Sequence, residues 1–280
     1  MTETGRKIIE KLDEWKMREG NLPRLLELYR GMVEIQSQVR GQIKPLELDM
    51  DDKTISHLIS SGKPLVEFND IAIDWNLFFT AFLQISQLIK SYPELSAENF
   101  IELRDGSDLK ELTRSWFNNE TMTESQISMI VHVALKPFLE ACRDAVIGSF
   151  NIEQWRRGYC PVCGGMPDIA FLEKENGAKW LLCSRCDARW IFQRLECPYC
   201  GNNDQDTLAY FTDDQELYRL YVCERCNSYI KAIDLRKTED EVILPLERYF
   251  TIDLDSQAQS KGYSIRGRAV IGGNTVSNPI

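Results

Sequence analysis

GYCPVCGGMPDIAFLEKENGAKWLLCSRCDARWIFQRLECPYCG, residues 158–201, holds three CxxC pairs, and YVCERC at 221–226 adds a fourth. The pairs are separated by 19, 10 and 22 residues. Paired cysteines at such fixed spacing are typical of metal ligation or of redox chemistry. The candidate ligands are Cys160, Cys163, Cys183, Cys186, Cys197, Cys200, Cys223 and Cys226.

The four pairs form an internal repeat. Aligning CPVCG at Cys160 with CPYCG at Cys197 also brings LLCSRC onto YVCERC, with three extra residues in the second copy. The copies share seven identities within these motifs, which indicates a repeated module. Because each copy contains four cysteines, the repeat favours one site in each copy. A cross-braced arrangement is the alternative, in which the first pair joins the third and the second joins the fourth.

Each copy has the spacing of a four-thiolate metal site. A CxxC turn directs two thiolates at one point, and about 20 residues at roughly 3.3 Å each let a hairpin run out and return. Four thiolates form a soft tetrahedral site for zinc or a single iron ion. Because the protein fills all four positions, neither ion is expected to do hydrolytic chemistry. We expect both sites to be structural, stapling a fold with little core, or electron-transferring.

Charge disfavours nucleic acid as a partner. The 280-residue chain has a formal net charge of −10 and only two histidines. Residues 160–226 hold seven Lys or Arg against eleven Asp or Glu, a net charge of −4. Ribbons that bind nucleic acid generally present a basic face. The composition therefore favours protein partners over nucleic acid or an anionic membrane surface.

The sequence predicts a cytoplasmic protein without membrane insertion. The amino terminus, MTETGRKIIEKLDEWKMREG, alternates charged and apolar residues and lacks the apolar core and cleavage site of a secretory signal. No stretch reaches the roughly 18 consecutive apolar residues that cross a bilayer. In a reducing compartment the nine cysteines are poor disulfide formers.

The first 150 residues have the apolar spacing of helices. Apolar residues recur at helical intervals over 8–15 and 25–35, with Gly20 and Pro23 between these segments. A further helix is expected over about 71–92. An all-helical bundle is the economical arrangement of this part of the chain.

Two other stretches complete the helical half. Residues 41–70 lack a sustained period and predict a long connection with a short helix inside it. Thr123 and Gln126 have the spacing of a capping box for a helix that reaches about Ile147, with Pro137 as a kink or break. Cys142 on this helix is expected to be a small buried hydrophobe, and His57 and His132 ordinary helix residues.

The cysteine-rich half has short strand-like segments ended by turn residues, such as 179–182, 217–222 and 229–233. Residues 242–250 are compatible with a helix or a strand. The predicted fold class is α+β, with an all-helical bundle followed by two tandem metal-binding modules made of short β-hairpins. The expected divisions are a helical domain at 1–157, a first ribbon at 158–194, a second ribbon at 195–235 and a C-terminal segment at 236–280.

Three motifs carry a resemblance to a known family. GYCPVCGGMP at 158–167, LLCSRCDARWIFQRLECPYCG at 181–201 and YVCERCNSYIKAI at 221–233 resemble the formate dehydrogenase accessory protein family, FdhE. The resemblance covers the whole ribbon region and the order of helical half and ribbons. It implies two rubredoxin-like or zinc-ribbon sites for iron or zinc, with the eight cysteines as ligands. The residues after Ser264 and Ile265 match no family motif.

The resemblance also implies a function. It implies a non-catalytic maturation factor in the cytoplasm that binds the catalytic subunit of a molybdenum- or tungsten-dependent formate dehydrogenase. The alternatives are a rubredoxin-like redox or electron-transfer protein and, disfavoured by the acidic ribbons, a nucleic-acid-binding zinc ribbon protein. Zinc at both sites would remove the redox alternative, because zinc has no accessible redox couple.

Overall fold

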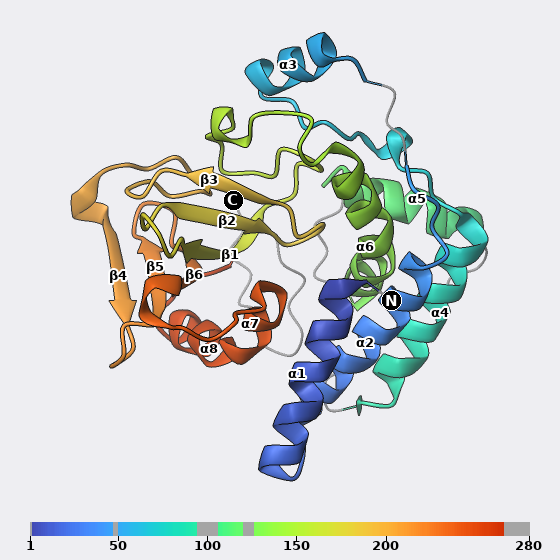
Figure 1. The fold of residues 1–280 in the computed structure, drawn as a ribbon, viewed down its shortest axis with the longest axis horizontal. Helices are drawn as coiled ribbons and strands as arrows, with labels where there is room; N and C mark the ends of the chain where they lie inside the picture. The colour runs from blue at the N-terminus through green and yellow to red at the C-terminus, as the bar shows by residue number, and fades with distance from the viewer. Residues whose placement is uncertain (1, 47–49, 94–105, 120–125, 266–280) are drawn as a thin grey trace. The chain divides into compact units, whose positions relative to one another are not determined.

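The computed structural model describes residues 2–46, 50–93, 106–119 and 126–265 (Figure 1). The helices are α1 (Glu3–Glu19), α2 (Arg24–Arg40), α3 (Asp52–Ser61), α4 (Trp75–Lys90), α5 (Gly106–Phe117), α6 (Gln126–Val146), α7 (Leu244–Phe250) and α8 (Ile252–Ser260). The strands are β1 (Pro167–Leu172), β2 (Lys179–Cys183), β3 (Arg189–Phe192), β4 (Leu208–Thr212), β5 (Tyr218–Cys223) and β6 (Ser228–Asp234). The expected α+β class is confirmed, with a helical half followed by strand-rich cysteine modules. Within the described residues, no helix is long and apolar enough to cross a bilayer.

The described chain forms two compact units. The first comprises the chain up to Lys44 together with Ala72–Phe138. The second comprises Pro45–Ile71 and the chain from Leu139 onward. The segment at 45–71, which precedes most of the helical half, thus belongs to the unit that contains the ribbons. The four-part division expected from the sequence stays a prediction.

The first unit is a helical assembly in which α2 packs against both α1 and α4. A Cβ atom at Gly31 of α2 would lie 2.8 Å from Cδ2 of Leu88 in α4, so the missing side chain permits the close approach of these helices. Phe78 of α4 is fully buried and its ring lies 6.2 Å from that of Phe138. The helical periodicity of the sequence therefore corresponds to real packing faces.

Local signals explain where individual helices begin and end. α3 lies inside the expected long connection, where Asp51 accepts a hydrogen bond from the Thr54 backbone N–H at 2.8 Å. The helix ends at Gly62, which has a left-handed φ of 75°. α6 continues through Pro137 to Val146, so the proline does not break the helix. Thr123 lies outside the described residues.

All six strands form one sheet in the order β3-β2-β1-β6-β5-β4. Neighbouring strands are antiparallel except β1 and β6, which pair in parallel with Ile169 opposite Lys231. β1 to β3 come from the first repeat copy and β4 to β6 from the second. The two sets of hairpins are therefore joined edge to edge, which the sequence did not indicate because parallel pairing leaves no local turn signal.

The second unit buries one face of this sheet under α7 and α8, which lie side by side against it in Figure 1. Leu244 of α7 packs with Ile169 and Ile233. Ala258 of α8 packs with Leu220 and Val222. Residues 242–250, expected as helix or strand, are thus mainly the helix α7.

Candidate metal centres

The first repeat copy brings four buried cysteines together. Cys160 Sγ lies 3.6 Å from Cys186 Sγ, and Cys163 Sγ lies 3.5 Å from Cys183 Sγ and 3.6 Å from Cys186 Sγ. All four side chains are almost inaccessible to solvent. Burial raises the pKa of the Cys160 and Cys186 thiols well above its usual range. A bound cation is therefore needed to keep four thiolates in this place.

The second repeat copy forms a matching group nearer the surface. Cys197 Sγ lies 3.7 Å from Cys226 Sγ, and Cys200 Sγ lies 3.7 Å from Cys223 Sγ. Cys200 is exposed and Cys226 is half-buried. The two groups thus share their geometry and differ in how far solvent reaches the sulfur atoms.

Both groups have the dimensions of a tetrahedral four-sulfur site. Within each group all ligand atoms lie within 4.8 Å of one another. The sulfur separations are far longer than the roughly 2.05 Å of a disulfide. Four sulfurs at about 2.3 Å from a zinc ion would lie about 3.8 Å apart, close to the separations found here. The structure groups the cysteines within each repeat copy, and it does not bring them together in the cross-braced order.

Each CxxC turn ends in a left-handed residue. Gly164 and Gly201, which follow the first pair of each copy, have φ values of 69° and 68°. Asp187 and Asn227 follow the second pairs with φ values of 56° and 51°. Gly, Asn and Asp adopt this conformation most readily, which explains why these residue types stand at these four positions.

Hydrogen-bond donors point at the sulfurs. The backbone N–H groups of Val162 and Arg185 lie 3.4 Å from the Sγ atoms of Cys160 and Cys183. In the second group the Asn202 side-chain amide lies 3.5 Å from Cys223 Sγ. Donors in these positions stabilise thiolate over thiol, as metal ligation requires.

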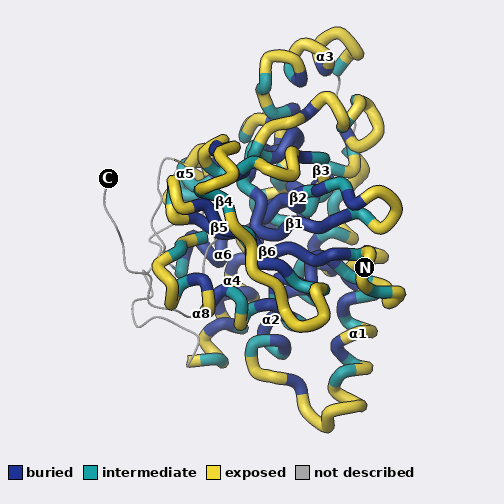
Figure 2. Tube along the Cα trace, turned by 90° about the vertical axis from the view of Figure 1, so that its left-hand side faces the viewer, coloured by how far each residue is buried: buried dark blue, intermediate teal, exposed yellow. Residues whose placement is uncertain are grey.

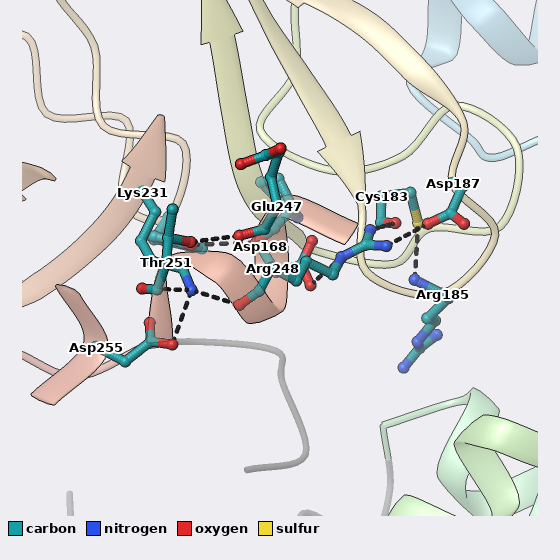
Figure 3. Close-up of polar contacts among 11 residues, drawn as sticks. Asp168, Cys183, Arg185, Asp187, Lys231, Glu247, Arg248, Thr251 and Asp255 are labelled. Atoms are coloured by element: carbon teal, nitrogen blue, oxygen red, sulfur yellow. Dashed lines mark hydrogen bonds and ion pairs between the residues drawn. The ribbon is translucent and has the colours of Figure 1, made fainter. Parts of the chain in front are cut away.

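Arg248 of α7 contacts the turn that carries Cys183 and Cys186 (Figure 3). The sequence alone did not identify this residue. Its guanidinium donates to the Cys183 carbonyl oxygen, to Asp168 Oδ2 and to Asp187 Oδ1, each at 2.7 Å. The side chains of Arg248, Asp168 and Asp187 are all nearly buried. One cation thereby fixes both ends of the turn that carries Cys183 and Cys186.

Lys231 of β6 ties the same helical pair to the sheet. Its ammonium, fully buried, donates to the carbonyl oxygens of Arg248 at 2.9 Å and Thr251 at 3.2 Å (Figure 3). It also pairs with Asp255 Oδ2 at 2.8 Å. The junction of α7 and α8 is therefore positioned by the strand that joins the two repeat copies.

The segment at 62–66 lines the first CxxC turn. The backbone N–H groups of Leu65 and Val66 donate to the carbonyl oxygens of Pro161 and Val162, each at 2.9 Å. On another side, Arg143 near the end of α6 donates to the Cys186 carbonyl oxygen at 2.8 Å. These contacts come from chain segments outside the CxxC motifs, so the motif spacing held no signal for them.

The second CxxC turn rests on the first repeat copy. A Cβ atom at Gly158 would lie 1.8 Å from the Pro198 carbonyl oxygen, so only glycine fits there without a shift. The Tyr199 hydroxyl donates to the Pro167 carbonyl oxygen at 3.1 Å. The two cysteine groups are thus mechanically linked through the loop that carries Cys197.

The other residues singled out in the sequence lie away from these centres. Cys142 is fully buried, as expected. The His132 ring stacks on Trp116 with a centroid distance of 5.2 Å, and His57 lies on α3. Within the described residues, the groups that can hold a metal contain cysteine alone.

Comparison with known proteins agrees with the motif pattern. The sequence model of the FdhE central domain matches residues 159–194, which carry the first four-cysteine group. A protein FdhE homolog of Aquifex aeolicus (strain VF5) is 29% identical over 246 residues, covering 85% of both chains. Protein FdhE of Escherichia coli O1:K1 / APEC is 23% identical over 226 residues, 79% of this chain and 72% of the relative.

The chain is similar to FdhE proteins over most of its length.

The likeness to FdhE extends to the fold. The crystal structure of the FdhE protein from Pseudomonas aeruginosa matches with a TM-score of 0.61 and 18% identity, over 95% of this chain and 93% of that one. The match covers nearly the whole of both chains, so the FdhE fold includes the helical half as well as the cysteine modules.

Proposed function

We propose that the chain is a maturation factor that binds the catalytic subunit of a molybdenum- or tungsten-dependent formate dehydrogenase. The observation that carries the proposal is a pair of closed four-cysteine groups on one sheet, in a chain that is similar to FdhE proteins over most of its length. Because cysteine fills each group, a bound ion would have no open position for a substrate. The protein therefore acts through protein contact and is not an enzyme.

The proposal includes two metal ions, each zinc or iron, held by the eight cysteines. The sulfur separations, the buried first group and the N–H donors support this assignment. The ions would fix the CxxC turns against the sheet and so shape the surface that meets the partner. We place this action in the cytoplasm, because thiols arranged for metal persist where the compartment is reducing.

Copurification tests the function. An affinity-tagged chain is expressed at native level in cells that make a formate dehydrogenase, and the captured proteins are identified by mass spectrometry. We expect the catalytic subunit to be enriched over a tagged control protein. Repeated recovery of the chain without that subunit would contradict the proposed function.

A second candidate is a rubredoxin-like electron-transfer protein, and the exposed position of Cys200 favours it. An iron ion in the second group would lie near enough to solvent to exchange electrons with a partner. Elemental analysis of protein purified without added metal separates the two. Zinc in both groups would remove the redox candidate, since zinc does not change its oxidation state.

A further inference from the structure

The second unit contains a half-open pocket beside the second cysteine group. It encloses about 470 Å³ of space, part of which is open to solvent. Its walls are residues 194–199 on one side and strands β4, β5 and β6 on the other. Four tyrosines give it an apolar, aromatic lining, namely Tyr199, Tyr210, Tyr221 and Tyr229.

A buried cation contributes to the wall of this pocket. Lys179 of β2 is only 2% exposed, and its ammonium donates one hydrogen bond, to the Glu196 carbonyl oxygen at 3.2 Å. The nitrogen lies 5.0 Å from the centre of the Tyr221 ring and 5.5 Å from that of Phe192. Among the described residues no carboxylate lies within ion-pair distance of it, although Glu196 also lines the pocket and attracts it electrostatically. An ammonium has three donors, so this one has capacity left for a ligand.

Burial lowers the pKa of Lys179 to about 8, while the nearby Cys197 and Glu196 oppose that shift. A buried cation is stable only when an anion or several acceptors meet it. The chemistry of the pocket therefore selects a carboxylate carried on an apolar body.

The mouth of the pocket indicates a polypeptide. Leu195 and Tyr210 line the pocket and are 59% and 55% exposed, which is unusual for large apolar side chains that lie so close together. Figure 2 shows β4 as an exposed strand at the border of the sheet. A small ligand held inside the pocket would leave these side chains in water, whereas an extended chain across the mouth would cover them.

The backbone of β4 supports the same reading. The Glu224 N–H donates to the Thr207 carbonyl oxygen at 2.9 Å, and the Asp213 N–H to that of Tyr218 at 3.3 Å. With this register, the N–H and C=O groups of the alternate residues Leu208, Tyr210 and Thr212 face away from β5. In the described part of the chain no strand pairs with them there. Natural sheets rarely leave an apolar border strand of this kind without a purpose.

We infer that this pocket receives a glutamate or aspartate side chain of the client polypeptide, flanked by apolar residues, with the carboxylate on Lys179. The inference rests on the proposed function for the identity of the client. A second copy of the chain fits less well, since its own β4, LAYFT, contains no carboxylate. Arg194 also lines the pocket, so two cations face the single lining carboxylate, that of Glu196.

Two matched probe peptides test the inference on the full metal-loaded chain. One is a fluorescein-labelled peptide with a central glutamate between valine and phenylalanine residues, and the other has glutamine in its place. Fluorescence anisotropy should show at least about tenfold tighter binding of the glutamate peptide, the loss expected when a buried charge pair is removed. Equal binding of the two peptides by the wild-type chain would overturn the inference.

Variants locate the interaction. Lys179→Met should abolish the preference for glutamate, whereas Lys174→Met, an exposed lysine paired with Glu239, should retain it. Tyr210→Ser changes an exposed side chain, and it should weaken the binding of both peptides. A preference that survives in Lys179→Met would contradict the assignment. If free 4-phenylbutyrate competes as well as the unlabelled glutamate peptide does, the ligand is a small carboxylate and the polypeptide inference is wrong.

Copurification with the Lys179→Met chain separates this inference from the proposed function. Loss of the catalytic subunit from the variant, with retention by wild type and by Lys174→Met, supports both. Retention by all three chains overturns the pocket inference and leaves the maturation role standing. Failure of the wild-type chain to retain the subunit contradicts the maturation role, whatever the peptides show.

Discussion

The second module depends on each of its four cysteine sulfur atoms as a metal ligand. Replacing Cys197 with serine leaves three thiolates, and an alcohol is a poor ligand for a soft ion. We expect Cys197→Ser to lose one of two metal equivalents and to loosen the second module, while the helical unit stays folded. Elemental analysis and circular dichroism measure these two effects. A variant that still binds two equivalents would show that the ligand assignment is wrong.

Arg248 is expected to stabilise the fold strongly, although it lies outside the cysteine motifs. Arg248→Met would remove the guanidinium that forms ion pairs with the buried carboxylates of Asp168 and Asp187. Removing one partner of a buried ion pair usually costs about 3–5 kcal/mol of unfolding free energy. Urea denaturation of the metal-loaded protein measures the change.

An exposed ion pair provides the control for Arg248. Lys237 pairs with Glu216 at the surface, with side chains 40% and 57% exposed. Lys237→Met should lower the unfolding free energy by less than about 1 kcal/mol. If Lys237→Met and Arg248→Met lowered the unfolding free energy equally, the role given to Arg248 would be contradicted.

At the residue scale the sequence was informative only where chemistry repeats. The spacing of eight cysteines predicted two groups of four. Arg248 and Lys231 stand alone in the sequence, and a single charge carries no sign of whether it is buried. Their partners are distant along the chain, so only the folded structure brings them into view.

The two cysteine modules should differ in how readily they release metal. The first group is enclosed by the sheet, the 62–66 segment and α7, whereas Cys200 and Cys226 of the second are reached by solvent. A chromophoric chelator should therefore remove one equivalent quickly and the other slowly. Cys200→Ser should abolish the fast phase and leave the slow one. A single phase for both ions would contradict this difference between the modules.

At the element scale the helices were easier to predict than the sheet. Apolar residues at 3.6-residue spacing are local, so α1, α2 and α4 lie close to the expected positions. The hairpins of each repeat were also expected from their turns. The parallel pairing of β1 with β6 was not, because residues 169 and 231 meet only when the whole second module is in place.

The coupling of the two modules within the second unit can be tested at Gly158. A methyl group there would lie 1.8 Å from the Pro198 carbonyl oxygen and would displace the second CxxC turn. We expect Gly158→Ala to weaken metal binding in the second group by at least about tenfold, measured by competition with a chelator. The first group should keep its affinity.

Gly20→Ala is the matched control for this glycine. Gly20 has a φ of 80° and open space around its Cα, so the substitution strains the backbone without a collision. Its cost should be roughly 1–2 kcal/mol of stability with both metals retained. If Gly158→Ala keeps normal affinity in the second group, the contact with Pro198 does not couple the modules.

At the scale of the whole chain, segments that are neighbours in the sequence do not always belong to the same structural unit. Residues 45–71 precede α4, yet they belong to the unit that holds the cysteines. Their polar, aperiodic sequence correctly predicted a connection with a short helix. Nothing in that sequence indicated the backbone contacts of Leu65 and Val66, since such contacts depend on main-chain atoms that every residue type shares.

The parallel pairing of β1 and β6 can form only after a delay during synthesis of the protein. β1 ends at Leu172 and β6 ends at Asp234, 62 residues later. At roughly 5–20 residues per second, a ribosome needs about 3–12 s to make the intervening chain. Once Cys186 has been made, the first cysteine group is complete, while one border of β1 still lacks its neighbouring strand β6. The supply of metal ions during translation therefore decides whether β6 pairs with a first module that already holds its metal ion or with one that does not.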